Sequence, residues 1–104
     1  MIKGYYITVG NKGFFIQTEA QKKTKQLVQC MIQQIAIHRG LCQGWIERCM
    51  QDKECIDRTR HDMTPATITR VTTDNGYQYY SIKGNNFIAN YPEEDYHKDI
   101  IVFA

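Results

Sequence analysis

The sequence predicts an α+β fold in which helices pack on one face of a small antiparallel sheet. Residues 18–61 contain no proline, and their apolar residues recur at close to the 3.6-residue period of an amphipathic helix. Shorter segments rich in tyrosine, isoleucine and valine flank this stretch on both sides, as expected of β-strands. We therefore expect about five strands in the order ββ–αα–βββ, with one long broken helix or a helix pair between them.

The composition indicates one small globular domain that spans residues 1–104. The chain is 42% hydrophobic and 23% charged, which is close to the average for folded proteins and argues against disorder. It has no run of eighteen apolar residues, so we expect no membrane span, and its first residues do not resemble a secretory signal. All four cysteines lie in the helical stretch, which favours reduced thiols and a cytoplasmic location.

The first half of the chain is expected to form a hairpin followed by helices. Strands at 2–9 and 14–17 are joined by a glycine-containing loop. Thr18 and Gln21 fit a capping box, so we expect the first helix to begin there and to end at Gly40. Apolar residues at helical spacing are expected to be buried on this helix: Leu27, Val28, Met31 and Ile35.

A second helix is expected from Cys42 to Arg60. The nearby glycines at 40 and 44 favour two helices over the alternative, one long kinked helix from 19 to 60. The second helix carries its own apolar side, formed by Trp45, Ile46, Cys49 and Ile56.

Asn75-Gly76 predicts a second hairpin, with a two-residue type I′ turn between strands that begin at 66 and end at 82. That turn would pair Thr72 with Tyr79 and place one set of residues on the better core face: Thr69, Val71, Tyr80 and Ile82. The opposite, half-exposed face would carry Ile68, Arg70, Thr72, Tyr77, Tyr79 and Ser81. Further strands are expected at 87–91 and 100–103.

A zinc site is the first chemical hypothesis, because Cys42, Cys49, Cys55 and His61 offer suitable ligands. Zinc ligands usually come in pairs two to four residues apart, whereas the gaps here are seven, six and six residues. Helical residues seven apart lie about 10 Å from each other along the axis, which is too far for one ion. We therefore expect small buried thiols, with no metal and no cofactor.

No combination of residues indicates an enzyme. A catalytic cysteine needs a histidine base within reach, and the sequence gives no second feature that joins one of the cysteines to His38, His61 or His97. Gly10 and Gly13 lie in a hairpin and not between a strand and a helix, so they do not predict a phosphate-binding loop.

The leading hypothesis is a non-catalytic protein that binds another protein and occludes or assembles it. The chain has seven tyrosines, a residue type enriched in interface cores. The partner-binding residues would include Tyr77, Tyr79 and Arg70. Self-association as a homo-oligomer is the simplest form of this hypothesis, and Ile32 and Ile37 are additional apolar residues on the first helix. Inhibitors and accessory proteins of phages and mobile elements are likewise small single domains with no active-site motif, although no sequence motif connects them to this chain.

Nucleic-acid binding is the alternative hypothesis. Lys22, Lys23 and Lys25 at the start of a helix would contact phosphates, while Tyr77, Tyr79 and Arg70 would stack on bases. Residues 1–63 carry ten Lys/Arg and six Asp/Glu, so +4, and residues 64–104 carry three and five, so −2. The net charge of +2 is low for a nucleic-acid-binding surface, which is why this hypothesis ranks second.

Overall fold

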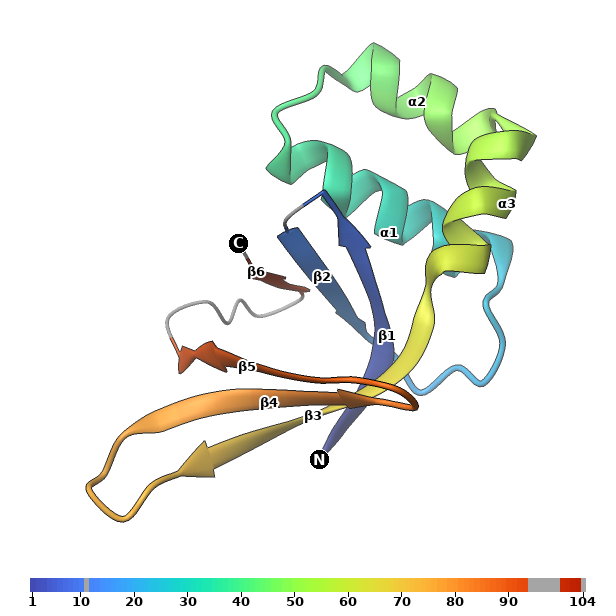
Figure 1. The fold of residues 1–104 in the computed structure, drawn as a ribbon. Helices are drawn as coiled ribbons and strands as arrows, with labels where there is room; N and C mark the ends of the chain where they lie inside the picture. Colours follow the sequence, from blue (N-terminus) through green and yellow to red (C-terminus); the bar gives the residue numbers. More distant parts are fainter. Residues whose placement is uncertain (11, 94–99, 104) are drawn as a thin grey trace. The chain divides into compact units, whose positions relative to one another are not determined.

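The structure is a computed structural model that describes residues 1–10, 12–93 and 100–103 and confirms the α+β class (Figure 1). The backbone forms two compact units. The sheet unit contains Met1–Glu19 and Thr64–Ala104, and the helical unit is Ala20–Met63. Both the single domain and the packing of helices on one face of the sheet stay predictions. Within the described residues, no helix has the length and apolar character needed to cross a membrane.

The sheet unit is one antiparallel sheet, with six strands in the described residues instead of about five. Neighbouring strands follow the order β5-β4-β3-β1-β2-β6. Their bounds are β1 (Ile2–Val9), β2 (Lys12–Gln17), β3 (Thr64–Thr72), β4 (Gln78–Gly84), β5 (Ile88–Pro92) and β6 (Ile100–Phe103). The strands expected near both ends of the chain are therefore confirmed, although Asn11 in the first loop lies outside the described residues.

The sheet curls around one of its own faces. The hydroxyls of Tyr6 on β1 and Tyr91 on β5 are hydrogen-bonded at 2.9 Å. In a flat sheet these strands would be about 14 Å apart, because three strand spacings separate them. The curled face encloses a hydrophobic core of Tyr6, Phe15, Ala66, Ile68 and Ile82, against which Ile2, Tyr80, Phe87 and Tyr91 pack. The core of this unit is therefore formed by the sheet itself.

The opposite face of β1 and β2 is also buried. Tyr5, Ile7, Phe14 and Ile16 alternate with Tyr6 and Phe15, and none of the four is more than 6% exposed. This explains why the two strands have nearly continuous apolar sequences instead of the simple alternation of a sheet with one wet face.

The helical unit contains three described helices where two were expected: α1 (Lys25–His38), α2 (Gln43–Gln51) and α3 (Lys53–Asp62). The break between α2 and α3 was not predicted: Asp52 interrupts the single helix that was expected from Cys42 to Arg60. Its backbone is extended, and its carboxylate accepts the Glu54 amide at 3.0 Å, so Asp52 is the N-cap of α3.

The start of α1 corrects a second prediction. Thr18 is not the N-cap, because its amide continues the sheet by donating to the Lys3 carbonyl at 3.0 Å. Thr24 caps the helix instead, with its hydroxyl accepting the Leu27 amide at 3.2 Å. The predicted end is confirmed: Gly40 has a φ of +71°, and the Leu41 amide donates to the Ala36 carbonyl, as in a Schellman motif.

Burial in the helical unit follows the predicted stripes only in part. The buried residues of the unit are Val28, Met31, Ile32, Ala36, Ile46, Ile56 and Met63. Leu27 and Ile35 are half-buried, whereas Ile37 and Trp45 are 52% and 40% exposed. The apolar face of α1 is therefore rotated towards Ile32 and Ala36 relative to the predicted stripe.

The β3–β4 hairpin has a register one residue away from the predicted one. Val71 lies opposite Tyr79 and Ile68 opposite Ile82, so Ile68 joins the core face while Thr69 and Val71 lie on the other face. The turn has three residues, with negative φ at Asn75 and +86° at Gly76. This matches a type I turn followed by a glycine bulge, whereas a type I′ turn needs positive φ at both central residues.

Candidate functional site

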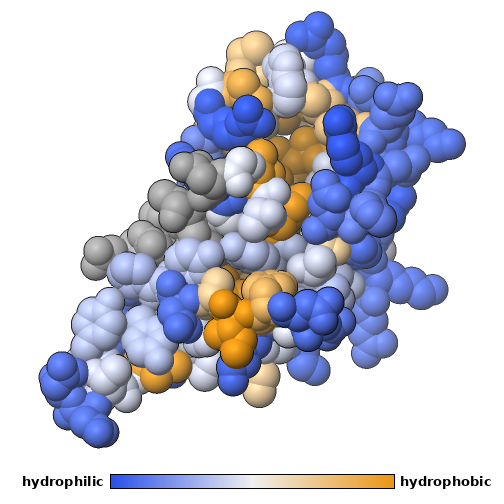
Figure 2. Space-filling view, in the orientation of Figure 1, coloured by the Kyte–Doolittle hydropathy of each residue, from blue (hydrophilic) through white to orange (hydrophobic). Residues whose placement is uncertain are grey.

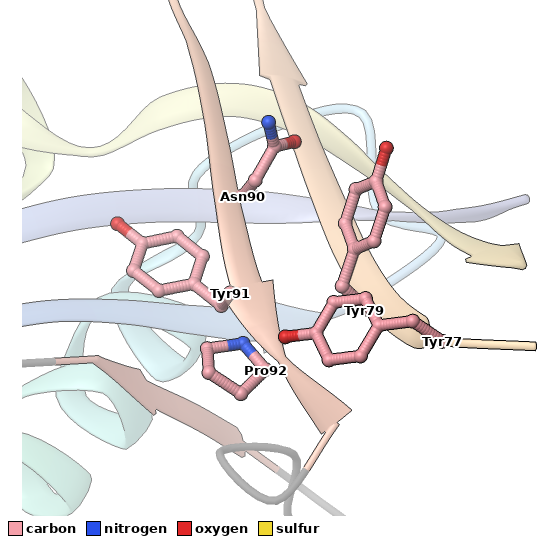
Figure 3. A pocket seen from close by; sticks show the side chains of 5 residues that line it. All are labelled: Tyr77, Tyr79, Asn90, Tyr91 and Pro92. Carbon is pink, nitrogen blue, oxygen red and sulfur yellow. The ribbon is translucent and has the colours of Figure 1, made fainter. Parts of the chain in front are cut away.

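Two stacked tyrosines at the start of β4 form the clearest candidate site: Tyr77 directly precedes the strand and Tyr79 lies within it. The rings of Tyr77 and Tyr79 are nearly parallel, with centroids 6.1 Å apart and an interplanar angle of 27°. Tyr77 is 54% exposed and Tyr79 is half-buried. Together with Asn90, Tyr91 and Pro92 of β5, they line an open hollow of about 270 Å³ (Figure 3). We call these five residues the tyrosine hollow.

Strand pairing brings the residues of the hollow together. Tyr79 lies directly opposite Pro92, and Asn90 lies two positions back on the same face of β5. In Figure 3 the side chains of Tyr79 and Asn90 project to the same side of the two strands. The sequence analysis identified the two tyrosines but missed Asn90, Tyr91 and Pro92, because the β4–β5 register that places them here is a long-range property.

The hairpin turn fixes the position of Tyr77. Its backbone amide donates to the Thr73 hydroxyl at 3.1 Å and lies 3.3 Å from the Asn75 side-chain oxygen. The Thr73 amide donates in turn to the Tyr77 carbonyl at 2.8 Å. These bonds hold the aromatic ring beside a turn that is itself hydrophilic, as the lower left of Figure 2 shows. The exposed ring is therefore carried by an ordered backbone.

Tyr91 connects the hollow to the core of the sheet unit. Its hydroxyl bonds to Tyr6, whose side chain is 7% exposed and lies with its ring centroid 5.2 Å from that of Phe87. Burial, together with the hydrogen bond and proximity to Tyr91, raises the pKa of the Tyr6 phenol well above its usual range. The Tyr6 hydroxyl therefore stays protonated and hydrogen-bonded at neutral pH.

Arg70 does not share a face with the tyrosine pair, contrary to the predicted face assignment. It lies opposite Tyr80 and therefore points to the other side of the sheet from Tyr79. Its guanidinium forms an ion pair with Glu93 at 2.6 Å and a hydrogen bond with the side chain of Gln78. The tyrosine hollow is consequently lined by uncharged residues alone.

The three predicted lysines belong to the helical unit and lie in different environments. Lys22 and Lys23 precede α1, and Lys25 is its first residue; Lys22 and Lys25 are exposed. The Lys23 ammonium donates to the Arg60 carbonyl at 2.6 Å and to the Met63 carbonyl at 3.0 Å. These carbonyls lie at the C-terminal end of α3, where they have no hydrogen-bond donor within the helix. The Lys23 ammonium therefore supplies the donor that the helix itself lacks.

The cysteines are not buried thiols, which corrects that prediction. Cys30 and Cys42 are exposed, Cys49 and Cys55 are half-buried, and all four are free. Among the described residues, no group of three or more His, Cys, Asp or Glu side chains is arranged to hold a metal ion.

A second hollow, of about 230 Å³, lies in the helical unit between Trp45, Arg48, Cys49 and Asp52. Partial burial and the neighbouring thiol of Cys55 raise the pKa of Cys49. A raised pKa leaves less thiolate at neutral pH, which is the opposite of what a cysteine nucleophile needs. Cys49 is therefore not activated as a nucleophile.

No protein-family model matches the chain, and neither a curated protein nor a solved structure matches it.

Proposed function

We propose that this chain is a non-catalytic protein that binds another protein through the tyrosine hollow. The observation that carries the proposal is the stacked pair of tyrosines, which an ordered hairpin holds beside an uncharged hollow. Tyrosine supplies a large contact area with few rotatable bonds, and it dominates the binding energy of many protein interfaces. Binding at this surface would occlude or assemble the partner.

The charge distribution supports a protein partner over a nucleic acid. Base stacking also uses exposed aromatic rings, so the tyrosine pair by itself fits both classes of ligand. A nucleic acid needs cations along its phosphates, however, and Arg70 is on the other face and paired with Glu93. Lys23 is likewise occupied by backbone carbonyls. Nucleic-acid binding therefore remains the second candidate.

A site-specific photo-crosslinking experiment tests the proposal. A benzoylphenylalanine residue replaces Tyr77 in one variant and exposed Glu47 of α2 in the control variant. Irradiation of native cells is expected to give a discrete protein adduct from position 77 only. An adduct with the mass of two copies of the chain would identify the protein partner as a second copy. Equal labelling from both positions, or an adduct that nuclease removes, would contradict protein binding at this surface.

Matched double substitutions separate the two candidates. Each variant is used as bait to retain the partner protein that the crosslink identifies. Tyr77→Ala with Tyr79→Ala is expected to abolish this capture, since both rings are lost. Lys22→Glu with Lys25→Glu should leave capture unchanged, because both side chains are exposed and lie in the other unit. Lys23 is left intact in this comparison because of its bonds to the end of α3. Loss of capture in the lysine variant alone would favour the nucleic-acid candidate.

A further inference from the structure

We infer that the tyrosine hollow binds an uncharged, proline-rich segment in the polyproline II conformation. The inference rests on the proposed protein-binding function and names the kind of segment that the hollow would take. Three properties of the hollow support it: the spacing of its rings, the hydrogen-bonding groups that it offers, and its lack of charge.

The ring spacing matches a polyproline II helix. This helix rises about 3.1 Å per residue, so residues two apart are separated by about 6.2 Å along its axis. The centroids of Tyr77 and Tyr79 are 6.1 Å apart. Because the helix has three residues per turn, two of every three residues can face one surface. The contact residues of such a segment are therefore spaced along its axis as the two rings are, and Pro92, opposite Tyr79, also lines the hollow.

The polar groups of the hollow complement a chain that contains many prolines. Proline has no backbone N–H, and a polyproline II helix has no internal hydrogen bonds, so the segment presents carbonyl acceptors only. The hollow offers the hydroxyls of Tyr77 and Tyr79 and the side-chain amide of Asn90, all of which can donate. An extended strand, by contrast, would bring N–H groups that need acceptors as well.

The uncharged lining and the small volume of the hollow favour a peptide segment over other occupants. The hollow is lined by three tyrosines, an asparagine and a proline, and Arg70, on the other face of the sheet, is paired with Glu93. A phosphate or carboxylate ligand would lose its hydration without gaining a cation. The volume of about 270 Å³ lies below the roughly 300–1,000 Å³ of typical small-molecule sites. The hollow therefore suits a short stretch of a longer chain that continues beyond it.

Titration of the full-length, ¹⁵N-labelled chain with blocked decaproline tests the inference. Decaproline is expected to give saturable shifts in the amide resonances of residues 77–91, while a Gly-Ser peptide of equal length gives none. Removing both rings by Tyr77→Ala with Tyr79→Ala should weaken binding about tenfold or more, as loss of aromatic anchors does. Trp45→Ala, which removes an exposed aromatic from the helical unit, is the matched control and should leave the affinity unchanged.

The variants also separate stacking from hydrogen bonding. Tyr77→Phe with Tyr79→Phe keeps both rings, so it should retain part of the affinity that the alanine variant loses. Decaproline shifts no larger than those of the Gly-Ser peptide would overturn the inference, whereas the crosslink from position 77 would still test protein binding by itself. If oligothymidylate shifted the same amide resonances more strongly than decaproline does, both proposals would be overturned.

Discussion

Gly4→Ala provides a direct test of how the curled sheet closes. Gly4 lies in β1, paired with Gln17 of β2 and Ala66 of β3. A Cβ atom at this position would lie 2.1 Å from the carbonyl oxygen of Ile16 and 2.6 Å from the ring of Phe15. The carbonyl cannot rotate away without breaking the sheet, and Phe15 is 1% exposed. Relief of the collision therefore requires the strands to move.

The expected cost follows from overpacking in a close-packed interior, which typically lowers stability by about 1–3 kcal/mol. Because the main obstacle is a backbone atom, we expect the upper part of this range, about 3 kcal/mol. Replacing glycine also reduces the conformational entropy of the unfolded chain, which raises the unfolding free energy by about 0.4–1 kcal/mol. The net loss of unfolding free energy is then about 2–3 kcal/mol.

Urea denaturation of three glycine variants measures this effect. At Gly84 the three atoms nearest to the added Cβ all belong to the ring of half-buried Phe87, the first at 2.1 Å, so Gly84→Ala should cost about 1 kcal/mol. At Gly44, in α2, nothing lies within 4 Å, and Gly44→Ala should be neutral or stabilising by up to about 1 kcal/mol. A Gly4→Ala variant within about 0.5 kcal/mol of the parent chain, or more stable than Gly84→Ala, would refute the reasoning.

Three further predictions concern individual side chains. Lys23→Met should lower the unfolding free energy by about 1–2 kcal/mol, because it removes the ammonium that donates two hydrogen bonds to the end of α3. In the same urea assay, Lys22→Met, at an exposed position, should change the unfolding free energy by less than about 0.5 kcal/mol. The raised pKa of the Tyr6 phenol means that the folded state keeps a proton that the unfolded chain loses near pH 10. The stability that the protonated Tyr6 phenol contributes is therefore complete below about pH 10 and is lost as the pH rises further. Urea midpoints between pH 8 and 11 should therefore fall less steeply in Tyr6→Phe, and parallel curves would count against this. The raised pKa of Cys49 predicts slower alkylation by iodoacetamide in the folded protein than in urea at the same pH, and equal rates by mass spectrometry would disprove it.

The sequence predicted the elements of the fold better than their boundaries. The α+β class, the two early strands and the end of α1 at Gly40 all follow from local signals: periodicity, β-forming residues and a glycine where positive φ is needed. The start of α1 was wrong because two threonines compete as N-caps. Thr18 fits a capping box locally, but its amide is already bonded to Lys3 in the sheet, which only the tertiary structure shows.

The candidate site was predicted only where a single strand determines it. Tyr77 and Tyr79 share a face because they are two residues apart, whatever strand lies beside them. Asn90 and Pro92 are eleven to fifteen residues away from these tyrosines in sequence, and only the pairing of β4 with β5 makes them neighbours. No local pattern carries that information.

The functional conclusion depends on one residue in the β3–β4 turn. The sequence motif at 74–76 is compatible with both a two-residue and a three-residue loop, and the two differ by one step of register. Since side chains alternate between faces, that step decides whether Arg70 lies beside the tyrosines or behind them. With the observed loop, Arg70 lies opposite Tyr80, on the face of the sheet away from Tyr77 and Tyr79. The face that carries these two tyrosines therefore lacks the one cation that β3 would have supplied. This placement of Arg70 is one reason why we propose a protein partner for the tyrosine hollow and rank a nucleic acid second.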